Sequence, residues 1–259
     1  MYRPSSIHQV TPPIHRYLRD KHLPPPVVVG GVGGSGTRLV VQLLQGLGVS
    51  MGRHLNESED AMPFVPVYDN HINNYLKGSI NPTKLVDELL IALLDHQSPS
   101  PDAGLWGWKN PRSIYLLPLL DELFEGMRFI HVVRDGLAMS TSGNQTQLEK
   151  HGKHVIPQHL QALPQAEQSL LLWSIVNNAA ADYGAQMGDR YFLLRYEDVC
   201  DNPSGSTAAL ALALNIKFPK VLNLPINSPR RRDHHDMTKM SKTTVSIASK
   251  ALQRFGYIC

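Results

Sequence analysis

The chain has 259 residues, 42% of them hydrophobic, and its 25 basic and 22 acidic residues give a formal net charge of +3. This length suits one large α/β domain with a sizeable core, and the small basic surplus argues against a nucleic-acid-binding protein. With two cysteines, no run of 18 apolar residues and no signal-peptide core, the sequence predicts no disulfide framework and no membrane span, and we expect a cytoplasmic protein.

Residues 1–26 are predicted to form an N-terminal arm, and residues 27–259 a single domain. Pro24-Pro25-Pro26 ends the arm, because consecutive prolines disfavour a helix and lead into an extended segment. The apolar residues that follow, from Val27 onward, predict a strand. A glycine-rich turn then leads into a helix over residues 36–48, whose leucines form one apolar stripe.

The rest of the chain alternates between segments typical of helices and of strands. Helices are predicted at residues 63–77, 82–95, 112–124, from 135 onward, 165–187, 206–214 and 243–255. Strands are predicted at residues 105–109, 128–133 and 191–194, and residues 150–157 are predicted to be a loop. The alternation predicts an α/β fold, a single P-loop-like domain with a central parallel sheet flanked by helices on both faces. In such folds ligands bind at the carboxyl ends of the strands.

A glycine-rich loop follows the first strand, with the sequence Gly33-Gly34-Ser35-Gly36-Thr37-Arg38. Glycines permit a tight turn in which several N–H groups face one anion, and the N-terminus of the next helix adds partial positive charge. Counted from Gly31, the spacing fits a Walker loop, but Thr37 and Arg38 stand where an NTPase has Lys and then Ser or Thr. The loop therefore favours a nucleotide whose chemistry needs no metal, or else a turn that serves packing alone.

A second group follows the predicted strand at residues 128–133. Arg134 directly follows that strand, and Ser142 comes eight residues later, about two helical turns on. A guanidinium and a hydroxyl can together bind one phosphate, whereas Arg134 beside Asp135 alone would more often form an ion pair or a helix cap. Together with the first loop, the pair indicates a second phosphate site.

These stretches resemble the PAPS-dependent sulfotransferase superfamily, most closely its bacterial and its tyrosylprotein and carbohydrate branches. The donor of that superfamily is 3′-phosphoadenosine 5′-phosphosulfate (PAPS). Residues 33–38 look like its 5′-phosphosulfate loop, and Arg134 with Ser142 looks like its 3′-phosphate pair. Lys109-Asn110-Pro111-Arg112 is similar to its Lys-Asp-Pro segment, and residues 194–198 are a weaker match to its Arg-Tyr-Glu-Asp run. The resemblance implies transfer of a sulfuryl group from PAPS to an acceptor hydroxyl, with release of PAP and without a metal.

The resemblance also implies roles for the donor-binding residues. The loop, with Thr37 and its backbone amides, would hold the 5′-phosphate, and Arg134 and Ser142 would hold the 3′-phosphate. Most members have Lys or Arg at the position of Gly34, so that function is either lost here or supplied by Arg38 or by a basic residue of another loop.

Catalytic roles follow from the same resemblance. Lys109 is the candidate cation for the negative charge that grows on the bridging oxygen as the donor cleaves. Glu57 is the first candidate for the general base that accepts the proton of the acceptor hydroxyl, and Asp60 and His54 are the alternatives.

Two groups near the C-terminus have competing interpretations. Arg230-Arg231-Arg232 would either close over the 3′-phosphate or form a solvated face, and His234-His235 is interpreted as a polar loop instead of a metal site.

The acceptor stays open between a small molecule, a carbohydrate, a lipid and a peptide hydroxyl, with specificity expected in residues 51–75 and 149–164. Two other functions also stay open. One is a P-loop nucleotide kinase or NTPase, which would need ATP and magnesium, and the other is a catalytically impaired PAP-binding protein, suggested by Gly34. The oligomeric state is not predicted.

Overall fold

A computed structural model describes residues 9–96, 104–217 and 237–258 of the chain. Its central sheet has four parallel strands in the order β2-β1-β3-β4. They are β1 (Val27–Gly31), β2 (Gly107–Lys109), β3 (Arg128–Val133) and β4 (Tyr191–Arg195). Because the chain goes from the central strand β1 first to one neighbour and then to the other, the strand order reverses beside β1, which is where such sheets bind ligands.

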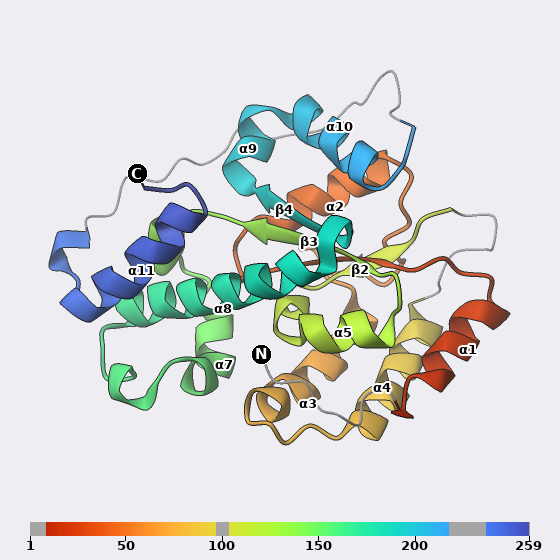
Figure 1. The fold of residues 1–259 in the computed structure, drawn as a ribbon, viewed down its shortest axis with the longest axis horizontal. Coiled ribbons are helices and arrows are strands. Elements are labelled where there is room, and N and C mark those ends of the chain that lie inside the picture. The colour runs from red at the N-terminus through yellow and green to blue at the C-terminus, as the bar shows by residue number, and fades with distance from the viewer. Residues whose placement is uncertain (1–8, 97–103, 218–236, 259) are drawn as a thin grey trace.

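Helices cover both faces of this sheet, as the sequence predicted (Figure 1). One face carries α2 (Thr37–Gly46), α9 (Tyr196–Asp201) and α10 (Pro203–Ala213). The other face carries the larger layer, which consists of α1 (Pro12–Asp20), α3 (Val65–Leu76), α4 (Pro82–Asp95), α5 (Leu117–Leu123), α6 (Gly136–Ser140), α7 (Thr146–Val155), α8 (Gln165–Met187) and α11 (Lys242–Arg254). The short 3-10 turns η2 (Met62–Phe64), η4 (Pro111–Leu116), η5 (Gln158–Leu160), η6 (Gly188–Arg190) and η7 (Met237–Lys239) connect these elements.

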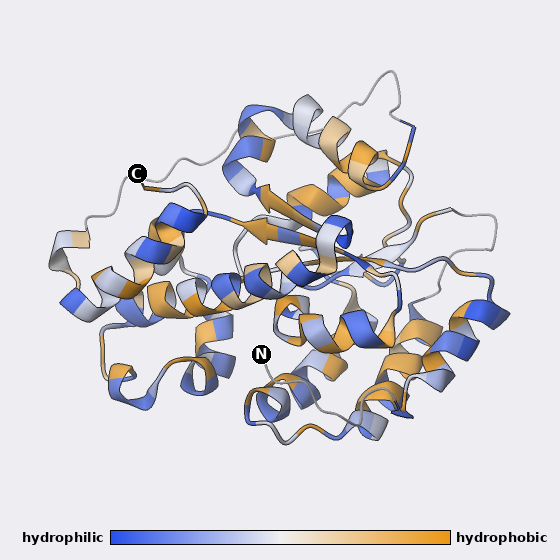
Figure 2. Cartoon of the chain, in the orientation of Figure 1, coloured by the Kyte–Doolittle hydropathy of each residue, from blue (hydrophilic) through white to orange (hydrophobic). Residues whose placement is uncertain are grey.

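Each strand of the sheet supplies apolar side chains to both layers. Side chains of successive strand residues point to opposite faces, so Val28 packs in the larger core, while Val27 and Val29 pack in the smaller one. Figure 2 shows mainly hydrophobic strands enclosed by helices that carry both hydrophobic and hydrophilic residues. Burial on both faces explains why these strands are continuously apolar in the sequence.

The prediction of a loop at residues 150–157 was wrong, because α7 continues through Val155. Gly152 and the neighbouring polar residues suggested a loop, but the helix buries Gln147 and His151. His151 Nδ1 lies 2.8 Å from Asn73 Oδ1 on α3, and the Tyr115 hydroxyl donates to Gln147 Oε1 over 3.0 Å. This packing offsets the low helix propensity of the glycine.

The predicted N-terminal arm contains α1, and Ile14 and Leu18 of this helix lie in the larger core. The Tyr17 hydroxyl ties α1 to α4 by donating to the Leu93 carbonyl over 3.3 Å.

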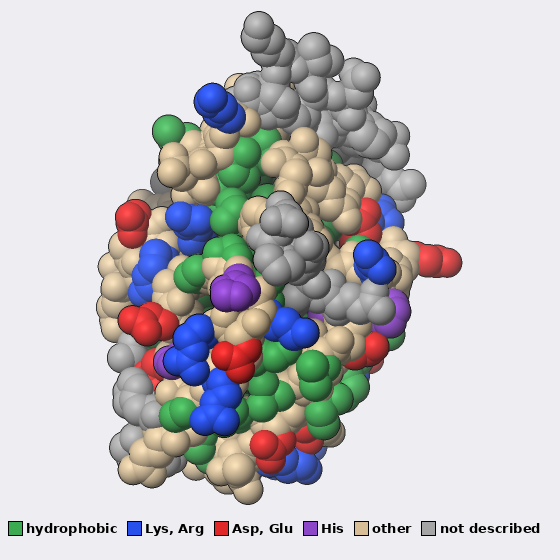
Figure 3. All heavy atoms as spheres, turned by 90° about the vertical axis from the view of Figure 1, so that its right-hand side faces the viewer, with side chains coloured by type: hydrophobic (Ala, Val, Ile, Leu, Met, Phe, Trp, Pro, Cys, Tyr) green, Lys and Arg blue, Asp and Glu red, His purple; other side chains and the backbone are tan. Residues whose placement is uncertain are grey.

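On the face in Figure 3, the described Lys and Arg side chains are interspersed with Asp and Glu.

None of the described helices combines the length and the apolar character needed to cross a bilayer.

Candidate functional site

A cavity of about 550 Å³ lies at the carboxyl ends of the strands, and residues that follow all four strands line it. The glycine-rich loop follows β1, Asn110 follows β2, Arg134 follows β3 and Tyr196 follows β4. Among the described residues of its wall, five are basic and one is acidic: Arg38, Lys109, Arg112, Arg134 and Lys150, and Asp60. This balance favours an anionic ligand.

The glycine-rich loop owes its shape to two left-handed residues, Gly34 with φ +92° and Gly36 with φ +87°. A Cβ atom on Gly36 would lie 2.1 Å from Tyr196 Cδ2, so the backbone approaches that ring more closely than any other residue would permit. Gly36 is also the N-cap of α2, and no side chain caps that helix end in the described part of the chain. The first amides of α2 therefore fit an anion at this edge of the cavity.

The loop residues contribute unequally to the cavity. Gly33, Gly34, Gly36, Thr37 and Arg38 line it, whereas Ser35 is not part of its wall. The Ser35 side chain is buried, and its hydroxyl has no hydrogen-bond partner within the described residues.

Arg134 and Ser142 both border the loop at Gly34. Arg134 Nη1 donates to the Gly34 carbonyl over 3.3 Å, and the guanidinium lies 4.6 Å from the centre of the Tyr196 ring. Ser142 Oγ would be 4.0 Å from a Cβ atom on Gly34, and it accepts a hydrogen bond from the Asn144 amide. Arg134 lines the cavity, but Ser142 lies just outside its wall.

Glu197 connects the ends of β3 and β4 to the C-terminal segment. Its Oε1 atom accepts from the Asp135 amide over 3.0 Å, and its Oε2 atom accepts from the Tyr257 hydroxyl over 2.9 Å. Asp135 Oδ1 in turn accepts from the Leu137 amide and caps α6. These contacts fix the backbone next to Arg134.

Lys109 lies at the end of β2 with its side chain only 2% exposed. Its ammonium group donates to Asp60 Oδ1 over 2.6 Å and to the Ser58 carbonyl over 2.7 Å. Burial lowers the pKa of Lys109, and the contacts with Asp60 oppose this change. Both residues line the cavity, which places a cation and a carboxylate side by side in its wall.

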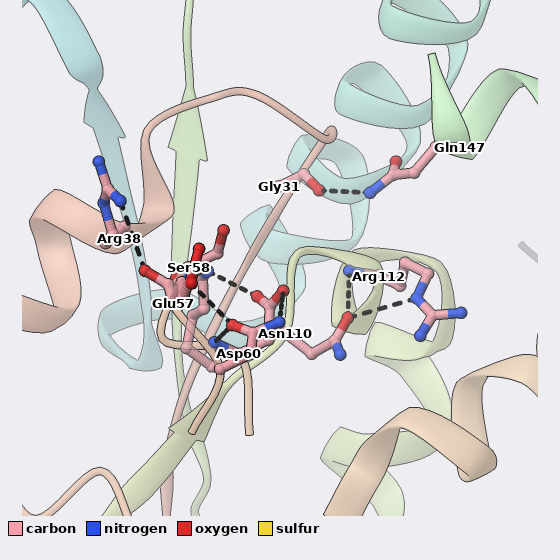
Figure 4. A network of polar contacts seen from close by, with 10 residues as sticks. Gly31, Arg38, Glu57, Ser58, Asp60, Asn110, Arg112 and Gln147 are labelled. Carbon is pink, nitrogen blue, oxygen red and sulfur yellow. Dashed lines mark hydrogen bonds and ion pairs between the residues drawn. The ribbon is translucent and has the colours of Figure 1, made fainter. Parts of the chain in front are cut away.

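The three candidate bases come from the loop between α2 and η2, and Figure 4 shows two of them, Glu57 and Asp60. The Asn56 side chain shapes this loop by accepting from the amides of Ser58 and Asp60, each over 2.9 Å. Asp60 lines the cavity, and Glu57 and His54 do not.

The exposed candidates have contacts elsewhere. Glu57 is exposed, and its backbone carbonyl accepts from Arg38 Nη1 over 3.4 Å. His54 Nδ1 lies 3.3 Å from Asp95 Oδ1 at the end of α4.

Gln147, Arg112 and Lys150 are among the residues of the cavity wall that were not assigned a role from the sequence. Gln147 Nε2 donates to the carbonyl of Gly31, the last residue of β1, over 3.4 Å (Figure 4). Arg112 and Lys150 both contact Asp69 Oδ1, over 2.5 and 2.7 Å. Because these contacts join residues far apart in the chain, local spacing gave no signal for them.

The remaining sequence candidates concern metals and the basic loop. Within residues 9–96, 104–217 and 237–258, no group of three or more His, Cys, Asp or Glu side chains could hold a metal ion. Arg230-Arg231-Arg232 and His234-His235 lie outside the described residues.

Comparisons with known proteins agree with this geometry. Residues 25–220, more than half of the chain, match the model of a family described as "Sulfotransferase family". The sulfotransferase domain of the Synechococcus PCC 7002 olefin synthase is similar, with a TM-score of 0.52 and 19% identity, over 88% of this chain and 87% of that one. The sulfotransferase STF1 from Mycobacterium tuberculosis H37Rv also has a TM-score of 0.52, with 11% identity, over 83% and 73% of the two chains. At these identities the likeness concerns the fold. The search of curated proteins gave no match.

Proposed function

Since this chain belongs to the sulfotransferase family, we propose that it transfers a sulfuryl group from PAPS to an acceptor hydroxyl and releases PAP. One observation carries this proposal. A glycine-rich helix N-terminus and five basic side chains converge on one cavity at the carboxyl ends of the strands. That arrangement suits a ligand with several anionic groups.

In this proposal the donor occupies the end of the cavity formed by the glycine-rich loop, Arg134 and Tyr196. The amides at the start of α2 and the Thr37 side chain bind the 5′-phosphate. Arg134 and Ser142, which both lie near Gly34, bind the 3′-phosphate that distinguishes PAPS from ATP. Arg38 lines the cavity and takes the place of the lysine that relatives have at the position of Gly34.

Two residues of the wall carry the transfer in this proposal. PAPS supplies an activated sulfuryl group, and Lys109 stabilises the negative charge that develops on the oxygen left behind. Asp60 accepts the proton of the acceptor hydroxyl, since it is the one of the three candidate bases that lines the cavity. Its bond to Lys109 holds the carboxylate in place. Glu57 and His54 would act only after a movement of their loop.

Calorimetric titration of the purified protein tests the donor assignment. We expect PAP to bind without magnesium, ATP with magnesium to bind weakly, and Arg134→Ala to abolish PAP binding. Arg16→Ala, which removes an exposed arginine on α1, is the control and should bind PAP normally. Tight magnesium-dependent ATP binding without PAP binding would overturn the proposal and favour a nucleotide kinase.

Gly34 favours one alternative, a protein that binds PAP but does not catalyse transfer. Slow hydrolysis of PAPS to PAP separates the two functions, because water can replace an acceptor that has not been identified. Hydrolysis above the buffer rate that Lys109→Ala removes would support an active enzyme. PAP binding with no hydrolysis and no transfer to any acceptor would support the impaired one.

A further inference from the structure

The cavity extends beyond the donor-binding residues to a second group of charges, which we call the Asp69 network: Asp69, Arg112 and Lys150. Asp69 lies on α3, Arg112 on η4 and Lys150 on α7, so three elements outside the donor motifs form it. Arg112 and Lys150 line the cavity.

The charges in this network do not balance. Arg112 Nη1 and Lys150 Nζ share one oxygen of Asp69, so two cations face one carboxylate and one positive charge remains. Burial opposes ionisation of Asp69, but contacts with Lys150 and Arg112 hold its pKa below the ordinary value, so the carboxylate stays charged at neutral pH.

Arg112 also keeps hydrogen-bonding capacity for a ligand. Its side chain is only 11% exposed, and the Asn110 side chain orients it by accepting from Nε over 3.4 Å (Figure 4). Asn110 and Asp69 occupy Nε and Nη1, and Nη2 has no hydrogen bond to the described residues, although the guanidinium lies 5.7 Å from the centre of the Tyr68 ring. A guanidinium fixed in this way is suited to a planar or tetrahedral anion.

The wall contains apolar side chains as well as these charges. Met62 and Val65, from η2 and the start of α3, line the same cavity as Lys109, Asp60 and the two cations of the Asp69 network. An organic molecule with a hydroxyl, an apolar part and an anionic group would find a matching surface for each.

We propose that the acceptor carries a carboxylate or phosphate group besides its hydroxyl, and that Arg112 and Lys150 bind this group. The inference rests on the proposed function and adds a substrate class to it. Hydroxylated acids or phosphate esters would then be accepted, and their neutral counterparts would be poor acceptors.

Binding to the PAP-saturated protein tests this inference without requiring turnover. The probes are 4-hydroxyphenylacetate and 6-hydroxyhexanoate, each beside its methyl ester, and glycerol 3-phosphate beside glycerol. The carboxylate and phosphate pairs separate the two kinds of anion. We expect the charged member of at least one pair to bind about tenfold or more tightly than the neutral one, as one new charged contact would give.

Variants then assign the effect to the network. Lys150→Gln should remove most of the preference for the charged probe, and Arg112→Gln should remove all of it. Lys153→Gln changes an exposed lysine on the same helix and should keep the preference. Since Arg112 is buried and its loss can impair folding, Lys150→Gln, at a side chain that is 44% exposed, keeps the test decisive.

Three results would overturn the inference. In the first, no charged probe binds more tightly than its neutral counterpart. In the second, Lys150→Gln keeps the preference. In the third, Lys150→Gln weakens PAP binding as much as probe binding, which would place the lysine in the donor site. Failure of PAP itself to bind would instead contradict the proposed function, and the probes would then be titrated into the PAP-free protein with the same variants.

Discussion

The two ends of the cavity are built from different parts of the chain. The donor end consists mainly of backbone, with consecutive residues 33–38 turning so tightly that two of them have left-handed conformations. The other end consists of side chains from α3, η4 and α7, which two ion pairs to Asp69 hold together. A backbone cradle tolerates almost no added atoms, whereas side-chain contacts change with single substitutions. Under the proposed function, the rigid end would bind the donor and the adaptable end the acceptor.

Lys109 lines the same cavity, and its replacement should have the largest effect. We expect Lys109→Ala to lower kcat by about 10²- to 10³-fold, the usual loss when one preorganised group that stabilises transition-state charge is removed. Single-turnover assays with PAPS measure the loss, and calorimetry with PAP should show that donor binding persists. Lys84→Ala, on the exposed side of α4, is the control. Undiminished turnover would remove Lys109 from the catalytic machinery.

The backbone character of the donor end can be tested with two glycines of similar conformation. Gly36→Ala would drive a Cβ atom into the Tyr196 ring, whereas at Gly48, with φ +83°, the same atom meets open space. Both changes should cost about 1–2 kcal/mol of stability from left-handed strain. Only Gly36→Ala should also weaken PAP binding, because the loop must move to relieve the clash with the Tyr196 ring. We expect PAP affinity to fall by roughly tenfold or more.

Thermal unfolding and PAP titration of the two glycine variants measure these effects. Equal PAP affinity in both variants would show that the glycine-rich loop can shift without losing PAP binding. That result would contradict the distinction between a rigid and an adaptable end of the cavity.

Acidic pH should destabilise the end of the cavity formed by α3, η4 and α7 before it destabilises the end formed by the glycine-rich loop. His151 on α7 is buried, and burial together with the nearby cations Arg112 and Lys150 lowers its pKa to about 4, with Asp69 opposing and His154 adding to the shift. The unfolded chain binds a proton near pH 6.5, so between pH 6.5 and about 4 unfolding takes up a proton that the folded state rejects. The free energy of unfolding therefore falls as pH falls, by at most about 1.4 kcal/mol per pH unit for this group.

Denaturant unfolding at pH 7, 6 and 5 measures this slope, and His151→Gln should reduce it. The buried His131, whose pKa is also lowered to about 4, supplies a similar share that the variant retains. Hydrogen exchange at pH 5 should rise in α7 before it rises in α2. Simultaneous opening of both helices would contradict a difference between the two ends.

Ser142 should have the smallest effect of these positions. It lies just outside the cavity wall, and its hydroxyl already contacts the Asn144 amide. We expect Ser142→Ala to weaken PAP binding by about three- to tenfold, the value of one hydrogen bond. Adenosine 5′-phosphosulfate, which lacks the 3′-phosphate, should bind both proteins equally, so an equal loss for both ligands would assign the hydroxyl a structural role.

The helices and strands that the sequence predicted correctly are those whose conformation depends mainly on residues adjacent in the chain. The helices α4 and α8 have the predicted bounds, and each predicted strand forms part of the sheet. The predicted loop at residues 150–157 failed because Gly152 and several polar residues conceal a helix that is stabilised by contacts with α3 and α8.

The same distinction applies to the candidate site. Lys109 ends a strand, Thr37, Arg38 and Arg134 come after strands, and the structure brings all four to one cavity. The choice between Glu57 and Asp60 depends on a turn that the Asn56 side chain shapes. The spacing of these residues in the sequence does not reveal that turn. Arg112, Lys150 and Asp69 meet only after α3, η4 and α7 have packed together, so no local pattern could have predicted their contact.

The bridge through Glu197 has a practical consequence for handling the protein. Tyr257 reaches Glu197, which holds the amide beside Arg134, and Arg195 lies 4.6 Å from the centre of the Tyr257 ring. Tyr257, in the segment that follows α11, therefore supports the edge of the cavity at Arg134 through Glu197. A truncation that removes Tyr257 would disturb this edge of the cavity.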